Sequence, residues 1–292
     1  MTTTTGKQIG WKDRLLPTTT VHPGRWQFFQ PTRHPVDCTR PITKPGVEER
    51  EIIGTITGRL GVMHALFLEV VCFYAERTKI IEGGSLQILV DPYQIRKTMG
   101  RANKGGYSAE GIEVLTENLR RAAVRFHAGS RGGLPDIDGI LDRIESSPRT
   151  RTHPITGEER PLKRVVLSPT YRSWLENDLK LHYDPSPLAD LRHGVSAALA
   201  RLVLTHRDQP VGGWKINGLI EAVGARATRR NRQLVREDAD GLGAAGIVID
   251  GGRVLRGVPA TPAGVPATPA PYPLRQRAYP LRQRAYPLRQ RE

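Results

Sequence analysis

The sequence predicts an α+β, mainly α fold in which one topology occurs twice. Amphipathic helical stripes start near residues 59 and 187, and each is followed by two further helical segments. Each series then closes on short apolar runs that are typical of a β-hairpin. The order helix, strand, helix, turn, helix, hairpin is that of a winged helix. We therefore expect two tandem winged-helix domains, each a helix-turn-helix with a β-hairpin wing.

Composition indicates a basic protein without a membrane span. The chain has 292 residues and a formal net charge of +15. Residues 257–292 hold six Arg and one Glu, so they carry +5 and leave +10 for residues 1–256. This charge favours a polyanionic partner. Because no run of about 18 apolar residues occurs and two cysteines cannot form a disulfide framework, we expect a soluble, cytoplasmic protein.

Changes in composition predict four segments. Residues 1–58 are rich in Pro and Thr, and we expect an irregular, disordered arm because Pro removes backbone donors and blocks helix propagation. The first winged-helix domain is expected at 59–168, and a connector helix with the second winged-helix domain at 169–256. Residues 257–292 consist of Pro-rich and Arg-rich heptapeptide repeats, which favour a disordered tail.

The first domain opens with the strongest helical stripe of the chain. Pro92 directly after Asp91 favours the start of a second helix, because Pro suits the first helical position. The hydroxyl of Ser108 is a candidate N-cap for the third helix. In order, the expected elements are a helix at 59–77, a strand at 86–90, a helix from Pro92 to Gly100, a helix after Ser108, and a hairpin of 124–127 with 140–144.

The second domain repeats this order. Gly251 and Gly252 separate two apolar runs, which is a strong short-range signal for a hairpin. Asn217 is a candidate N-cap for the middle helix. After a strand at 163–167, the expected elements are, in order, a connector helix at 171–181, a helix at 187–203, a strand at 214–216, a helix from Asn217 to Gly224, a basic helix at 228–242, and a hairpin within 247–255.

The basic helix at 228–242 is the clearest candidate for contact with DNA. Val235, Ala239 and Leu242 lie on one side and are expected to face the core. Arg can bind guanine and Gln can bind adenine through paired hydrogen bonds in the major groove. The candidate base-reading residues are Arg229, Arg232, Gln233 and Arg236. The candidate phosphate-binding residues of this domain are Arg226, Arg230 and the wing residue Arg253.

The third helix of the first domain has mixed charge. It is expected to expose three carboxylates, which repel phosphate, although Glu can accept from cytosine. This domain could therefore read DNA or mediate a protein contact. The exposed residues are Glu110, Glu113, Glu117, Arg120 and Arg121. The candidate phosphate-binding residues before this helix are Lys97, Arg101 and Lys104.

The sequence contains no recognisable catalytic site. The eight histidines are scattered without a close pair at metal-ligand spacing. A Gly-rich loop ending in Gly-Lys-Ser/Thr and a Gly-x-Ser-x-Gly turn are both missing. We therefore expect a binding protein that is not an enzyme and that has no catalytic residue, bound metal or cofactor.

The chain resembles plasmid replication initiators of the tandem winged-helix, iteron-binding type over residues 59–256. The motifs that carry the resemblance are Leu89-Val90-Asp91-Pro92, Tyr107-Ser108, Val195–Arg207 and Gln209-Pro210-Val211-Gly212-Gly213-Trp214. The resemblance implies binding to double-stranded DNA with direct repeats at an origin, recruitment of host helicase and polymerase components, autoregulation, and a switch between monomer and homodimer. The alternative is a winged-helix transcription regulator that acts as an autorepressor.

Overall fold

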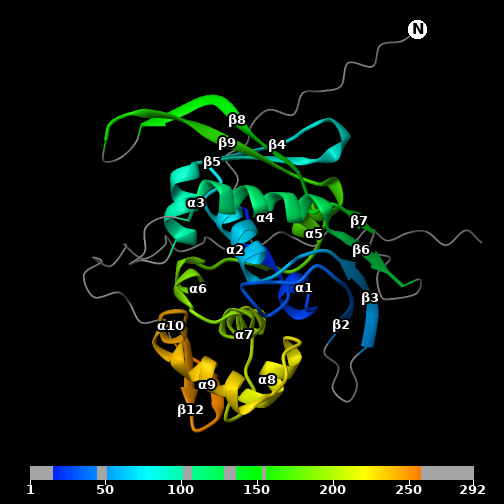
Figure 1. Cartoon of the computed structure of the whole chain (residues 1–292), viewed down its shortest axis with the longest axis vertical. Coiled ribbons are helices and arrows are strands. Elements are labelled where there is room, and N and C mark those ends of the chain that lie inside the picture. Colours follow the sequence, from blue (N-terminus) through cyan, green and yellow to red (C-terminus); the bar gives the residue numbers. More distant parts are fainter. Residues whose placement is uncertain (1–15, 45–50, 101–106, 128–135, 153–155, 258–292) are drawn as a thin grey trace, which may run out of the picture. The chain divides into compact units, whose positions relative to one another are not determined.

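The computed structural model describes residues 16–44, 51–100, 107–127, 136–152 and 156–257. By their contacts, all of these described residues belong to one compact unit, which we call the first unit. Within the described ranges the chain is a mixed α/β structure whose helices and sheets contribute to one buried apolar cluster (Figure 1). Each described helix is too short or too polar to cross a membrane. The predicted tail from residue 258 onward and residues 1–15 lie outside the described residues.

The C-terminal elements of the first unit form what we call the second repeat. Its three strands form an antiparallel sheet in the order β11-β13-β12, so the first strand pairs with the last strand of the hairpin. Gly251 and Gly252 form the turn of the hairpin with φ of 50° and 91°, and the predicted hairpin is confirmed. The elements are α7 (Gly194–Leu204), β11 (Trp214–Lys215), α8 (Ile216–Ala222), α9 (Arg229–Glu237), α10 (Ala239–Ala244), β12 (Ile247–Asp250) and β13 (Arg253–Arg256).

An earlier part of the chain, the first repeat, contains the same order of a helix, a strand, further helices and a hairpin, with additional strands between these elements. Its sheet has the order β4-β5-β9-β8, so β5 pairs with β9 and β9 with β8, as β11 pairs with β13 and β13 with β12. The predicted N-cap Ser108 is confirmed, because its hydroxyl accepts from Gly111 N at 2.9 Å, and Asp91 before Pro92 likewise accepts from Tyr93 N at 2.9 Å. The predicted N-cap Asn217 of the second repeat is wrong, because α8 already begins at Ile216 and Lys215 stands at the N-cap position. The elements are α2 (Val62–Phe73), β4 (Arg77–Ile80), the 3₁₀ turn η1 (Glu82–Gly84), β5 (Leu86–Val90), α3 (Pro92–Met99), α4 (Ala109–Arg121), β8 (Leu141–Thr152) and β9 (Glu159–Leu167).

The hairpin of the first repeat differs from the predicted one. The segment 140–144 does begin a strand, β8, but β8 pairs with β9 rather than with residues 124–127. Those residues form β6 (Ala123–Phe126), which lies between β3 and the short β7 (Ile137–Asp138). Strand partners distant in the sequence are chosen by tertiary packing, and the local apolar pattern does not specify them.

The prediction of an irregular arm is wrong for residues 16–44 and 51–58. These residues contain β1 (Thr19–Thr20), α1 (Val21–Arg25), β2 (Thr39–Lys44) and β3 (Glu51–Thr57), and the sheet β2-β3-β6-β7 is built on the last two. Trp26, Phe28 and Ile42 are buried in the core. The prolines are tolerated because of where they lie: Pro41, for example, is in β2, an edge strand with one unpaired side.

Two predicted helices are each split, and both breaks involve Asp238. The helix expected at 187–203 is divided into α6 (Ser186–Asp190) and α7, and the helix expected at 228–242 into α9 and α10. Asp238 lies between α9 and α10 and accepts the backbone N–H groups of Arg192 and His193, both at 2.9 Å. The buried carboxylate of Asp238 therefore ties the N-terminus of α7 to the end of α9. The predicted connector is α5 (Pro169–Asn177), followed by β10 (Lys180–Leu181), which pairs with β1.

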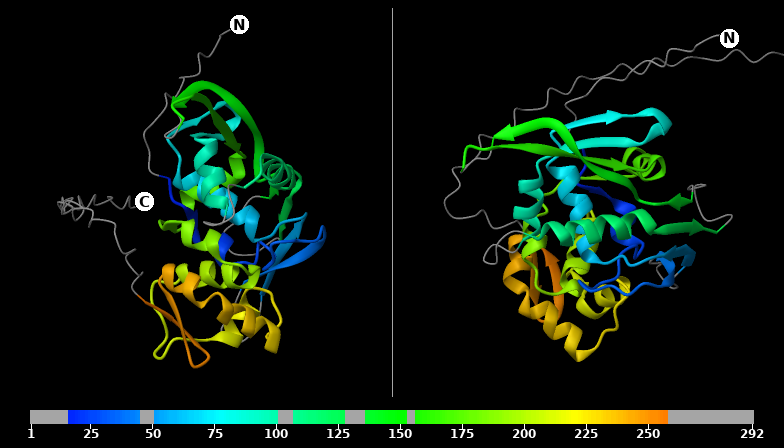
Figure 2. Two further views of the ribbon diagram at one scale, coloured as in Figure 1. Left: turned by 60° about the vertical axis from the view of Figure 1, so that its left-hand side comes forward. Right: turned by 45° about the horizontal axis from the view of Figure 1, so that its top comes forward.

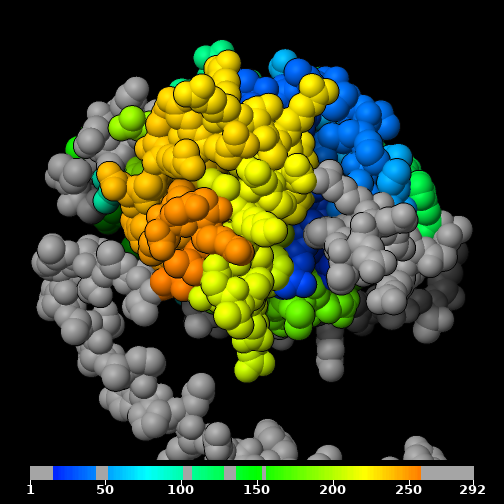
Figure 3. Space-filling view, turned by 90° about the horizontal axis from the view of Figure 1, so that it is seen from below, coloured from blue at the N-terminus to red at the C-terminus, as the bar shows by residue number. Residues whose placement is uncertain are grey.

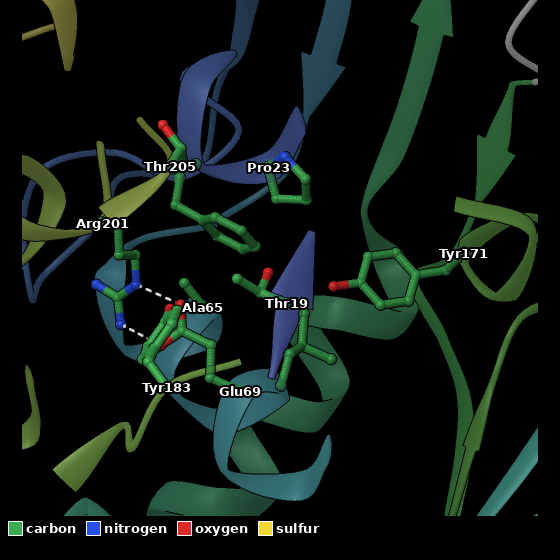
Figure 4. A pocket seen from close by; sticks show the side chains of 11 residues that line it. Thr19, Pro23, Ala65, Glu69, Tyr171, Tyr183, Arg201 and Thr205 are labelled. Carbon is green, nitrogen blue, oxygen red and sulfur yellow. Dashed lines mark hydrogen bonds and ion pairs between the residues drawn. The ribbon is translucent and has the colours of Figure 1, made fainter. Parts of the chain in front are cut away.

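The first helices of the two repeats, α2 and α7, contact each other in the interior. Here Glu69 and Arg201 form two hydrogen bonds of 2.6 and 2.8 Å, and their side chains are 4% and 8% exposed (Figure 4). Residues of the N-terminal segment, such as Thr19 and Pro23, line the small cavity beside this ion pair. The repeats thus share one core, and in both views of Figure 2 their hairpins lie at opposite ends of it.

Candidate nucleic-acid interface

Helix α9 carries its basic residues on the side away from the core. Thr228 starts the helix, and its hydroxyl oxygen accepts a hydrogen bond from the backbone N of Asn231 at 3.2 Å. Val235 is completely buried and fixes which side of the helix faces inward. The exposed residues of α9 are Arg229, Arg230, Gln233, Arg236 and Glu237. Three of the four predicted base-reading residues and one predicted phosphate contact therefore share this face.

The fourth predicted base reader, Arg232, lies at the flank of α9 and is half-buried. Its Nη1 donates to the carbonyl oxygen of Ala227 at 3.0 Å and lies 3.3 Å from Oδ1 of Asn217 in α8. The guanidinium group thus connects α9 to the start of α8 and to the turn that precedes α9. The sequence pattern placed Arg232 on the basic helix but did not reveal these local acceptors.

The exposed face of α9 ends at a carboxylate that is already hydrogen-bonded. Gln233 Nε2 donates to Glu237 Oε1 at 3.0 Å, and His193 Nε2 lies 3.0 Å from Glu237 Oε2. The hydrogen bond that the amide nitrogen of Gln233 makes to Glu237 therefore fixes the direction in which the amide oxygen points. The sequence analysis assigned no role to Glu237, although Gln and Glu four residues apart on a helix are neighbours.

The turn before α9 and the hairpin after it add further cations. Arg226 is exposed in the turn, and its carbonyl oxygen accepts from Asn231 Nδ2 at 2.8 Å. Arg253 is exposed on the hairpin, and its Nη1 lies 3.3 Å from the carbonyl oxygen of Gly213. Arg256, which the sequence analysis did not single out, donates to the carbonyl of His206 at 2.5 Å. In the view from below in Figure 3, α8, α9 and the hairpin (yellow to orange) lie together on one face.

The third helix of the first repeat, α4, has the mixed charge that the sequence predicts. Glu110 and Glu113 are exposed. Glu117 forms ion pairs with both Arg120 and Arg121, at 3.1 and 2.6 Å, so its carboxylate offsets part of their charge locally. The equivalent helices of the two repeats therefore present opposite charge to their surroundings.

Of the phosphate contacts predicted for the first repeat, Lys97 is described. It is exposed near the end of α3, with its Nζ 6.0 Å from the ring centre of Tyr93. Arg101 and Lys104 lie outside the described residues. The same repeat also carries cations on the hairpin β8–β9, such as Arg149 and Arg151, which the sequence analysis did not single out. Arg151 is ion-paired with Glu76 at 2.6 Å.

Titratable groups in the described ranges do not gather at this interface into a metal site. No group of three or more His, Cys, Asp or Glu side chains there could hold a metal ion. His64 is a buried structural group: burial lowers its pKa to about 4, and its Nδ1 accepts from the backbone N of Gly61 at 3.1 Å. Nε2 lies 3.2 Å from the amide of Asn118, so His64 joins the start of α2 to α4.

The chain matches no model of a known protein family and no curated protein sequence. Among solved structures, it is similar to a crystal structure of domains 2 and 3 of RctB. The two chains are 13% identical, the similarity covers 81% of this chain and 96% of that chain, and the TM-score is 0.44.

Proposed function

We propose that this chain is a sequence-specific double-stranded DNA-binding protein whose second repeat is a winged helix that inserts α9 into the major groove. One observation carries the proposal: α9 follows a helix and a tight turn, precedes a hairpin, and exposes Arg229, Gln233 and Arg236 on one face. A helix about 10–12 Å across fits the major groove, where Arg and Gln can bind base edges.

In this arrangement the exposed residues divide by position. Arg229, Gln233 and Arg236 read bases, while Arg226, Arg230 and Arg253 bind phosphates on either side of the groove. Arg232 acts as a support for the turn, because its guanidinium group already binds Ala227 and Asn217. The bonds of Thr228, Asn231 and Arg232 preorganise the helix, so less order has to be gained on binding.

The first repeat is a second winged helix that contacts DNA differently. Its α4 does not read bases, because Glu110, Glu113 and the paired Glu117 bring carboxylates where phosphates would lie. Lys97, Arg101 and Lys104 bind the DNA backbone instead. The exposed face of α4 is then free to contact another protein.

We further propose that the DNA is a replication origin with direct repeats, and that the chain initiates plasmid replication without catalytic activity of its own. Two copies of one DNA-binding topology in a single chain suit a partner with repeated sites. Host helicase and polymerase components would supply the catalysis. The resemblance of residues 59–256 to iteron-binding initiators supports this proposal.

Footprinting of the full-length protein on the DNA around its gene tests the binding proposal, with competitor DNA and a salt titration. We expect discrete protection at repeated sites, and loss of that protection in the double variant Arg229→Ala, Arg236→Ala. The matched control is Arg120→Ala, Arg121→Ala, which removes the same charge from α4 and should keep the footprint. Uniform, salt-sensitive binding without protected sites would refute sequence-specific recognition.

A transformation assay tests the initiator proposal separately. A circular DNA that carries this gene with its flanking sequence, and no other origin, should be maintained in a permissive host. The Arg229→Ala, Arg236→Ala variant should not maintain it. A footprint at a promoter without any maintenance of the circle would favour a transcription regulator instead.

A further inference from the structure

We infer that Gln27, in the N-terminal segment, is a positioning residue for the DNA-contacting helix α9. Its side chain completes the C-terminus of α8 and so holds the turn from which α9 begins. The inference rests on the function proposed for α9. It also assigns a role to the segment that the sequence predicted to be an irregular arm.

The backbone of α8 leaves one carbonyl for Gln27 to satisfy. At its end, Gly224 N donates to Glu221 O at 2.9 Å and Ala225 N to Ile220 O at 3.0 Å, which is a Schellman motif. Val223 N donates to Leu219 O at 3.1 Å. The last residue of the helix, Ala222, has a carbonyl that these bonds do not reach. Gln27 Nε2 donates to this oxygen at 2.8 Å.

The backbone of Gln27 adopts a conformation that side chains rarely take. Its φ is 53°, and no other non-glycine residue in the described ranges has a positive φ. Buried Trp26 and Phe28 anchor the chain on either side, and Arg40 from β2 donates to the carbonyls of Gln27 and Phe28. A conformation of this cost persists where the surroundings impose it, and such outliers gather at functional positions.

The turn itself is shaped to receive the Gln27 amide. Gly224 has φ of 85°, and a Cβ at this position would lie 2.9 Å from Oε1 of Gln27 and 3.3 Å from its Cδ. A larger residue at 224 would therefore push the Gln27 side chain from its place. The Gln27 side chain and Gly224 therefore fit each other although they are far apart in the sequence.

A short series of bonds holds the turn between α8 and α9. Gln27 holds its first end at Ala222, while Asn231 Nδ2 donates to Arg226 O and Arg232 Nη1 to Ala227 O at the end next to α9. The segment between Ala222 and Thr228 belongs to no helix or strand, so the regular hydrogen bonds of secondary structure do not hold it. Removing the Gln27 amide releases the first point of this series, and α9 then has to be ordered when DNA binds.

The test compares Gln27→Gly and Gln27→Asn in the full-length protein with Gln30→Gly and Gln30→Asn. Glycine relieves the positive φ, and asparagine tolerates it but is too short to reach α8. Gln30 is a matched control, since its Nε2 donates to Val36 O at 2.7 Å within the N-terminal segment. The DNA probes are a duplex that the wild-type protein selects from a random library and a scrambled duplex of the same length.

We expect both Gln27 variants to bind the selected duplex about three- to tenfold more weakly, with unchanged affinity for the scrambled duplex. Their backbone amides at 223–228 should exchange hydrogen faster, and the Gln30 variants should show neither change. The ratio of the two affinities is informative, because partial unfolding would weaken both duplexes equally.

Two results would overturn the inference. Unchanged exchange at 223–228 would mean that Gln27 does not hold the turn, whatever the affinities. Faster exchange with an unchanged affinity ratio would mean that the turn does not govern α9. If the wild-type protein selects no duplex, the proposed function fails, and with it the positioning of a DNA-reading helix, while the exchange experiment still decides the Gln27 contact.

Discussion

Replacing Glu69 by glutamine is expected to destabilise the folded protein by about 3–5 kcal/mol, since it leaves a charged arginine buried without its partner. The carboxylate of Glu69 accepts two bonds from Arg201, of 2.6 and 2.8 Å, and both side chains are over 90% buried. Burial by itself lowers the pKa of Arg201, but the Glu69 carboxylate outweighs this effect and the pKa is raised. A guanidinium group is too basic to lose its proton in a protein, so Arg201 remains charged when glutamine replaces its partner.

The magnitude follows from what Arg201 keeps in the variant. It retains one bond to the carbonyl of Ala197, at 3.3 Å, and can share the amide oxygen of the new glutamine. Neither group carries the opposite charge, so the desolvation of the guanidinium is no longer offset. Arg201→Met should cost a similar amount, because it leaves the carboxylate of Glu69 buried without its partner.

The assay is a double-mutant cycle of Glu69→Leu, Arg201→Met and their combination, measured by urea unfolding. The double variant should be more stable than either single variant, because apolar side chains can replace a buried ion pair at little cost. The midpoint temperature of thermal unfolding should be about 10 °C lower for Glu69→Gln than for the wild-type protein, given a chain of this size. Single variants within about 1 kcal/mol of wild type, or strictly additive effects, would refute the reasoning.

Three further predictions concern the same core. Burial lowers the pKa of His64 to about 4 from 6.5. The unfolded chain therefore binds the proton first, and urea unfolding should show up to about 3 kcal/mol of stability lost as the pH falls from 6.5 to 4, with a smaller loss in His64→Gln. In thermal unfolding, Gly194→Ala should lower the free energy of unfolding by about 2–3 kcal/mol, because its Cβ would overlap the backbone of the N-terminal segment. The control Gly218→Ala, with open space around it, should raise that free energy by up to about 1 kcal/mol. Ile42→Ala should lower the free energy of unfolding by about 2–5 kcal/mol, because Ile42 is fully buried. Val36→Ala, at a residue 62% exposed, should be nearly neutral. Equal effects of the two variants would mean that the predicted arm is not part of the core.

Local signals predicted the starts of the main helices. Asp91, Ser108 and Thr228 each accept a backbone N–H within three residues, so their side chains act on neighbours in the sequence. The hairpin around Gly251 and Gly252 was equally predictable, since the turn and both strands lie within ten residues. These features depend on short-range geometry, and a single sequence contains that information.

The errors have a different origin. Residues 16–44 are rich in Pro, yet they enter the core because Trp26, Phe28 and Ile42 find apolar partners far away in the sequence. The hairpin of the first repeat pairs β8 with β9, although residues 124–127 also have a strand pattern. In both cases the deciding contacts join segments whose proximity no local pattern expresses.

The sequence by itself determined that this chain is basic, that one order of helices and strands occurs twice, and that α9 is its most basic helix. Charge, periodicity and capping are properties of neighbouring residues, so they can be read without the fold. Only the tertiary structure decided which arginines of α9 face outward, that Arg232 is used within the turn, and that Gln27 reaches Ala222. Those outcomes depend on burial and on hydrogen-bond partners up to 195 residues apart, which exist only once the chain has packed.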